Sequence, residues 1–112
     1  MSEFSLIEAI KYWDRISKVE FCIFCYEKVH WSMNDMDDDV IKSVKRWVDG
    51  EENVKELKKI SNDTSFNNLI YGTVMSVCAW TNVEYFTDIA ATHAAEILLT
   101  SVEKLYLQYC NR

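Results

Sequence analysis

Proline is absent from this 112-residue sequence, and glycine occurs only twice, as Gly50 and Gly72. Proline is the strongest helix breaker, and both residue types build tight turns. A β-sandwich or an α/β fold needs many such turns, so their scarcity indicates an all-α chain. Hydrophobic residues make up 49% of the sequence. The chain can therefore bury a core that offsets its conformational entropy, as a single domain over residues 1–112.

Long hydrophobic runs are also missing. The longest, residues 21–26, is far too short to cross a bilayer. The first ten residues, "MSEFSLIEAI", lack the basic segment and the uniformly apolar stretch of a signal peptide. We therefore expect a cytoplasmic protein without a membrane partner, whose four cysteines stay reduced.

Positive charge is scarce. The sequence has 12 Lys and Arg against 18 Asp and Glu, and no Lys or Arg lies between Lys59 and Lys104. Because a nucleic-acid-binding protein must neutralise phosphates with Lys and Arg, we expect no nucleic-acid partner. The acidic residues form two clusters that are either solvated faces or docking surfaces for a basic protein partner. These candidate partner-binding residues are Asp35, Asp37, Asp39, Glu84 and Asp88.

Apolar residues spaced three or four apart predict a series of helices. The expected ranges are 3–31 (one long helix or two abutting ones), 39–49, a short helix at 52–61, 66–80, and a last helix to about 109 that follows a capping box at Thr81 and Glu84. Together they predict a compact antiparallel helical bundle of four long helices and one short helix. Ile16 and Trp80 are expected to face inward. Gly50 is expected in a left-handed helix end, and Gly72 at a close approach of two helices.

Catalytic and metal-binding motifs are weak. Cys22 and Cys25 have CxxC spacing but lie in a helical apolar run, whereas structural zinc sites with this spacing usually lie on a turn. The run "DMDDD" matches the opening of a calcium loop, but Val40 and Arg46 occupy its essential Gly and Glu positions. His93 fits a packed side chain better than a general base. We therefore expect no enzyme, no metal and no cofactor.

Aromatic residues exceed what a small core can hide. Candidate anchors for a protein interface, or for a homo-oligomer contact, are Tyr12, Tyr26, Trp31, Tyr71 and Tyr85. A different site is suggested by cations beside an aromatic ring. This alternative ligand-binding cluster, suited to a nucleotide messenger, consists of Lys42, Lys45, Arg46 and Trp47.

Five segments occur in a characteristic order over about residues 22–98: "CYEKV", "DMDDD", "VIKSVKRWVDGE", "NVKEL" and "AATHAAEI". In this order they resemble a family of bacterial immunity proteins, the fifth-numbered of the families found beside polymorphic toxins. The run from Trp47 to Glu51 is the most distinctive part. The family's prolines and an Arg in the acidic break are missing here, and bulkier residues replace alanines in the second half.

The resemblance implies a small all-helical, non-enzymatic protein that neutralises a toxin or effector by occlusion. It assigns no individual functional residue. Phage genomes carry related small helical domains, so the alternative is a phage-encoded anti-defence inhibitor, or a nucleotide-messenger sponge, acting on a bacterial immune system.

Overall fold

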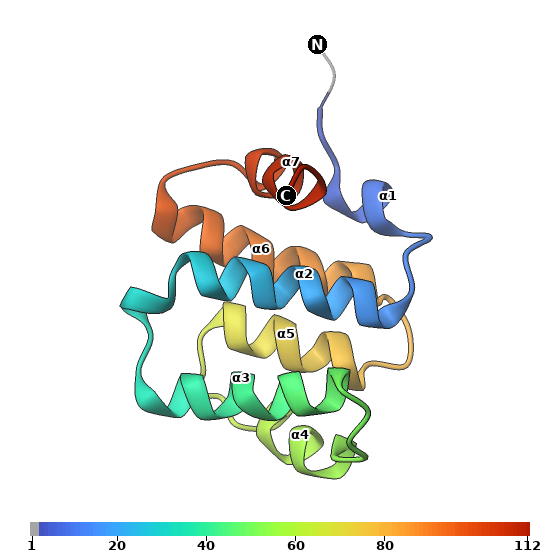
Figure 1. The fold of residues 1–112 in the computed structure, drawn as a ribbon, viewed down its shortest axis with the longest axis vertical. Coiled ribbons are helices and arrows are strands. Elements are labelled where there is room, and N and C mark those ends of the chain that lie inside the picture. Colours follow the sequence, from blue (N-terminus) through green and yellow to red (C-terminus); the bar gives the residue numbers. More distant parts are fainter. Residues whose placement is uncertain (1–2) are drawn as a thin grey trace.

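Helices provide every regular element in residues 3–112, the part of the chain that the computed structural model describes (Figure 1). They are α1 (Leu6–Ile10), α2 (Arg15–Lys28), the short 3-10 helix η1 (His30–Ser32), α3 (Asp35–Val48), α4 (Val54–Ser61), α5 (Asn68–Cys78), α6 (Val83–Leu98) and α7 (Val102–Cys110). The prediction of an all-α helical bundle is confirmed. The predicted number of helices is too small, because two of the expected long helices are interrupted.

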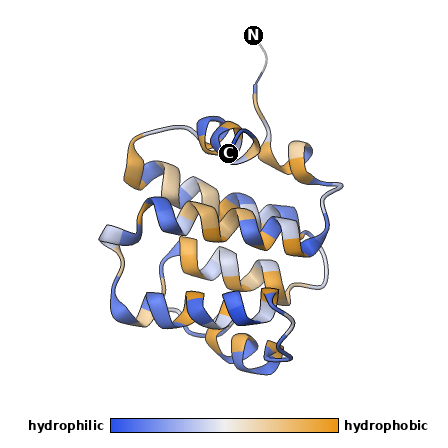
Figure 2. Ribbon diagram, in the orientation of Figure 1, coloured by the Kyte–Doolittle hydropathy of each residue, from blue (hydrophilic) through white to orange (hydrophobic). Residues whose placement is uncertain are grey.

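The centre of the bundle is α5, which packs against α2, α3, α4 and α6. The helices α1 and α7 close one end, and α4 lies at the opposite end (Figure 1). Hydrophobic residues line α5 and α6, whereas α3 is largely hydrophilic on its outer side (Figure 2). Within residues 3–112, none of the helices has the length and apolar character that crossing a membrane would require.

Side-chain caps explain where most helices begin. The residues whose side chains accept a backbone N–H at a helix start are Ser5, Asp14, Asn34, Asn67 and Ser101. Asp14 begins α2 after a break at residues 11–14, so the predicted 3–31 segment consists of two helices. Asn34 begins α3 four residues earlier than predicted, so the acidic run lies inside the first turns of this helix.

Two residues predicted to face inward are exposed. Ile16 is 45% exposed, because the restart of the chain at Arg15 shifts α2 out of phase with α1. Trp80 is 91% exposed, because α5 ends at Cys78 and the next residue, Ala79, is extended. In each case the apolar spacing continued through a point where the helix stops.

The last predicted helix is also interrupted. Its expected capping box at Thr81 and Glu84 is wrong: the N-cap is Asn82, which is left-handed with φ 58°. The helix α6 ends before Leu99, which is left-handed with φ 55° and 93% exposed, and α7 follows after residue 101. By contrast, the expected positive φ at Gly50 is confirmed, with a value of 105°.

Gly72 allows α5 and α6 to meet backbone to backbone, as predicted. A Cβ atom on Gly72 would lie 2.5 Å from the carbonyl oxygen of Phe86 and 2.7 Å from the nitrogen of Ala90. Beside this contact, the hydroxyls of Ser76 and Thr87 lie 3.0 Å apart, and both residues are fully buried. This polar pair fixes the register of the two helices inside an apolar core.

Candidate functional site

The three aspartates of the predicted acidic cluster have different surroundings. Asp35 and Asp39 are exposed on α3. Asp37 is buried, and its carboxylate accepts the backbone N–H of Asn34 at 3.1 Å. The reciprocal bond, from the N–H of Asp37 to the side chain of Asn34, completes a capping box. Asp37 therefore stabilises the start of α3, and its assignment to a partner-binding surface is corrected.

Glu84 and Asp88 share one side of α6, but neither is a freely exposed carboxylate. Glu84 accepts a hydrogen bond from the Lys18 ammonium at 3.2 Å, and the Lys18 side chain is only 8% exposed. The pKa of Glu84 is lowered by its own backbone N–H and by Lys18. Asp88 is half-buried in a hollow lined by the start of α1, and desolvation raises its pKa.

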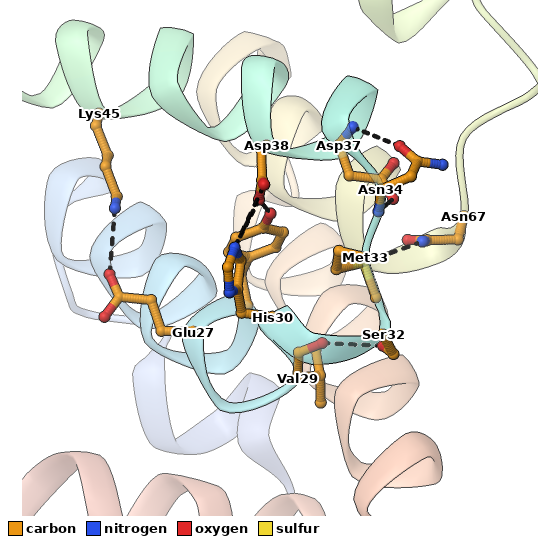
Figure 3. Close-up of polar contacts among 11 residues, drawn as sticks. Glu27, Val29, His30, Ser32, Met33, Asn34, Asp37, Asp38, Lys45 and Asn67 are labelled. Atoms are coloured by element: carbon orange, nitrogen blue, oxygen red, sulfur yellow. Dashed lines mark hydrogen bonds and ion pairs between the residues drawn. The ribbon is translucent and has the colours of Figure 1, made fainter.

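A groove of about 530 Å³ lies between the C-terminal part of α2 and α3, and ionisable side chains from both sides face one another there (Figure 3). Its lining residues are Tyr26, Glu27, His30, Asp38, Lys42 and Lys45. The Asp38 carboxylate accepts the hydroxyl of Tyr26 and lies 3.1 Å from Nε2 of His30. The groove thus combines an imidazole held by a carboxylate with two lysine ammonium groups, and such donors can hold an anion.

Only two residues of the predicted ligand-binding cluster lie at this groove. The cluster consisted of Lys42, Lys45, Arg46 and Trp47. Lys42 and Lys45 line it, and Lys45 lies 3.4 Å from the Glu27 carboxylate. Arg46 turns away to Glu51, at 3.2 Å, and Trp47 is half-buried near the start of α4. The helical periodicity of α3 separates the four residues, since neighbours in sequence point about 100° apart.

Sequence reasoning missed half of the groove. Glu27, His30 and Asp38 were assigned no role, and Tyr26 was expected on the surface, whereas it is only 3% exposed. Their three- or four-residue spacing along each helix is visible in the sequence. The pairing of α2 with α3, which brings the two sets together, is not.

Two highly exposed aromatic side chains lie in the loops that precede α2 and α6. Tyr12 is 89% exposed and Trp80 is 91% exposed. The guanidinium of Arg15 donates to the carbonyls of Ser76 and Val77 at 3.0 and 2.9 Å, so it joins the start of α2 to the end of α5. The loops that carry the two rings therefore lie at the same end of the molecule (Figure 1). We call Tyr12, Ile16 and Trp80 the aromatic end.

The remaining predicted anchors differ in exposure. Trp31 is 72% exposed on η1, and Tyr85 is 52% exposed on α6. Tyr71 is half-buried and meets the ring of Phe86 edge-on, with the ring centres 6.0 Å apart. Trp80, which was predicted to lie in the core, is more exposed than any of these candidates.

The two cysteines of the CxxC pair belong to the core. Burial raises the pKa of Cys22 to about 11, and it raises the pKa of Cys25 as well. A thiol with a raised pKa is a poor nucleophile at neutral pH. Across residues 3–112, no three His, Cys, Asp or Glu side chains are grouped as they would be to hold a metal ion.

No family model, no curated protein and no solved structure matches this chain. Every functional inference therefore rests on the residues and geometry of this chain alone. Membership of an immunity-protein family stays a prediction.

Proposed function

We propose that the protein is a non-enzymatic binding protein that neutralises a toxin or another effector by covering its working surface, as an immunity protein does. The observation that carries this proposal is the aromatic end. Tyr12 and Trp80 leave about nine-tenths of their surface in solvent, in a chain that packs most of its other aromatic rings. Exposed Trp and Tyr rings of this kind are the residues that most often dominate the energy of a protein interface.

Polar contacts that hold the helices on either side of the Trp80 loop support the same function. Arg15 holds the end of α5, and the ion pair between Lys18 and Glu84 holds the start of α6. These polar ties flank the loop that carries Trp80. A partner would thus meet a surface that is already ordered, which reduces the entropy cost of association.

The charge of the chain favours a basic partner. The formal net charge is −6 at pH 7. The exposed Asp35 and Asp39 lie in the N-terminal half of α3, at the other end of the molecule from the aromatic end (Figure 1). In this proposal they steer the partner by long-range attraction, and the aromatic rings provide the contact.

Co-expression tests this function. Each protein encoded beside the gene for this chain would be produced in cells, with and without the chain, and growth and complex formation would be measured. We expect the chain to restore growth against one of them, and Trp80→Ala to abolish the rescue. Trp31→Ala, which removes an exposed aromatic elsewhere, is the matched control. Full rescue by Trp80→Ala, or a lack of both rescue and complex, would contradict the proposal.

The α2–α3 groove favours a second candidate, a phage-encoded sponge that sequesters a nucleotide messenger. Lys42 and Lys45 would bind phosphates, and His30 would add a donor. Titration calorimetry with cyclic mono- and dinucleotides tests this candidate. We expect heat of binding that disappears in the Lys42→Ala, Lys45→Ala double variant; a flat titration of the wild-type chain would rule the candidate out.

A further inference from the structure

The α5–α6 pair has a second surface, on the side away from α2. The side that faces α2 is the buried seam of Cys22, Ser76 and Thr87. The other side carries half-buried residues of both helices together with the exposed Tyr85. We call this surface the outer face; it consists of Tyr71, Met75, Tyr85, Phe86, Ile89 and His93.

Close packing makes the outer face continuous. Because the backbones meet at Gly72, the outward residues of α5 lie directly beside those of α6. The Phe86 ring lies 6.0 Å from the Tyr71 ring and 5.5 Å from the Tyr85 ring, centre to centre. The result is an apolar strip across two helices, whose three aromatic rings contact one another before any partner arrives.

The two helices of the outer face carry negative charge and no positive charge. Residues 60–103, which include all of α5 and α6, contain no Lys or Arg. Glu96 is exposed on α6 beside the strip, and it has no ion-pair partner within residues 3–112. Nearby cations come from other helices at the Cys78 end, where Arg15 and Lys58 act on the thiol. An apolar strip on two cation-free helices, edged by the unpaired Glu96, matches a partner with apolar residues flanked by Lys or Arg.

We propose that the outer face docks one basic amphipathic helix of the partner protein. The helix would place apolar residues spaced three and four apart on Tyr71, Phe86 and Ile89, and a lysine on its edge would reach Glu96. This inference rests on the proposed function, and it names the surface and the chemistry of the partner.

A second copy of the chain is a poorer occupant of the same face. A symmetric dimer would bring the outer face of one protomer against that of the other. Since residues 60–103 offer no cation, Glu96 of each protomer would approach like charge. Like-charge contacts across an interface are unfavourable, so the face fits a basic partner better than itself.

A synthetic helix provides the test. The probe is a Leu/Lys peptide of about 18 residues, roughly five helical turns, added to the full ¹⁵N-labelled chain and followed by NMR. A peptide of the same composition in a non-amphipathic order, and a Leu/Glu peptide, are the controls for charge alone. We expect the Leu/Lys helix to shift amide signals of α5 and α6, and neither control peptide to do so.

Paired variants sharpen the result. Tyr85→Ala and Glu96→Lys, both at exposed positions, should each weaken peptide binding about tenfold. Trp31→Ala and Glu52→Lys remove an aromatic ring and reverse an exposed charge elsewhere, so they should leave the affinity unchanged. Far-UV circular dichroism of each variant checks that it is folded.

Several outcomes would overturn the inference: a footprint on α3, equal binding of the scrambled peptide, or a concentration-dependent dimer that shields the outer face. Growth rescue in co-expression separates the two proposals. Rescue that depends on Trp80 while the peptide binds elsewhere would reject the outer face and keep the neutralising function. A correct footprint without rescue by any neighbouring gene would do the reverse.

Discussion

Gly72 shows how a missing side chain sets the distance between two helices. Replacing it with Ala improves helix propensity by about 1 kcal/mol, yet the new Cβ would collide with the backbone of α6 at Phe86 and Ala90. Backbone cannot yield as a flexible side chain does, so we expect Gly72→Ala to lower the free energy of unfolding by about 2 kcal/mol. Urea denaturation measures this change.

The exposed Thr92 on α6 offers the control for helix propensity alone. Thr92→Ala should leave stability unchanged or slightly raised. If Gly72→Ala were as stable as the wild type, the close approach of α5 and α6 would be wrong.

Asp88 should make the protein less stable as the pH rises. Its folded-state pKa is raised by desolvation, so folding favours the protonated form and the charged form costs stability at neutral pH. We expect Asp88→Asn to raise the melting temperature at pH 7. The gain should shrink as the pH falls through the raised pKa and vanish below the ordinary value of about 3.9. Asp39→Asn, at an exposed site on α3, controls for the lost charge; a gain that persists at low pH would contradict this account.

At the residue scale, the predictions that depend on the backbone freedom or the size of a single residue were confirmed. The roles of Gly50 and Gly72 follow from the conformational freedom and the small size of glycine. The roles of Asp37 and Tyr26 could not be predicted, because an aspartate in a helix turn and a tyrosine on an apolar stripe are each found both exposed and buried. Whether each of the two is buried depends on its capping or hydrogen-bond partner. Which residue becomes that partner depends on where each helix begins.

At the element scale, the junction between α6 and α7 depends on an unfavourable residue. Leu99 adopts the left-handed conformation in which the N–H of Leu99 bonds to the carbonyl of Glu96, and that of Thr100 to the carbonyl of Ala95. For a residue with a Cβ atom this conformation costs about 1–2 kcal/mol. Since the Leu99 side chain is 93% exposed, little packing offsets the cost. We expect Leu99→Gly to stabilise the protein by about 1 kcal/mol in thermal unfolding.

The matched control for Leu99→Gly lies inside α7. Leu107 is 47% exposed and helical, so Leu107→Gly should destabilise the protein by about 1 kcal/mol. The same sign for both variants would show that Leu99 is not strained.

Helix positions could be predicted from apolar spacing, but the exact end of α5 and the break after Leu98 could not. The end predicted at residue 80 lies at Cys78. The two breaks use Asn82 and Leu99 in left-handed conformations, without a glycine or a proline to mark them. A leucine with the correct spacing reads as the next residue of the helix. The exposed Trp80 was misplaced for the same reason, and with it the main anchor of the aromatic end.

At the scale of the whole molecule, an aromatic cluster joins the two ends of the chain. The ring of Tyr109 in α7 lies 5.9 Å from Trp13, 5.1 Å from Phe21 and 5.2 Å from Phe24, centre to centre. Tyr109 is 8% exposed, so its removal leaves a cavity among these rings. We expect Tyr109→Ala to lower the free energy of unfolding by about 3 kcal/mol, measured by denaturation with tryptophan fluorescence as the signal.

The neighbouring residue Gln108 is exposed and does not share the cluster. Gln108→Ala should therefore leave the unfolding midpoint nearly unchanged. Equal losses for the two variants would mean that α7 contributes through its backbone rather than through the Tyr109 ring.

The candidate sites needed the assembled molecule. The sequence predicted an alternative ligand site that includes Lys42 and Lys45, and a candidate docking surface that includes Glu84 and Asp88. It could not show that α2 faces α3 across a groove, or that α5 and α6 combine into one outer face. Pairing between helices depends on the sum of many contacts, which no single motif encodes.

The backbone contact at Gly72 and the Ser76–Thr87 hydrogen bond also bear on the order in which the chain folds. The residues of that bond are 11 positions apart, whereas Arg15 and Ser76 are separated by 61. Closing a short loop costs less entropy than closing a long one, so contacts between near neighbours form early. We infer that the α5–α6 hairpin forms first, and that α2 and then the chain termini pack onto it. The outer face would then take shape among the first parts of the molecule, before the helices that pack on the other side of the hairpin.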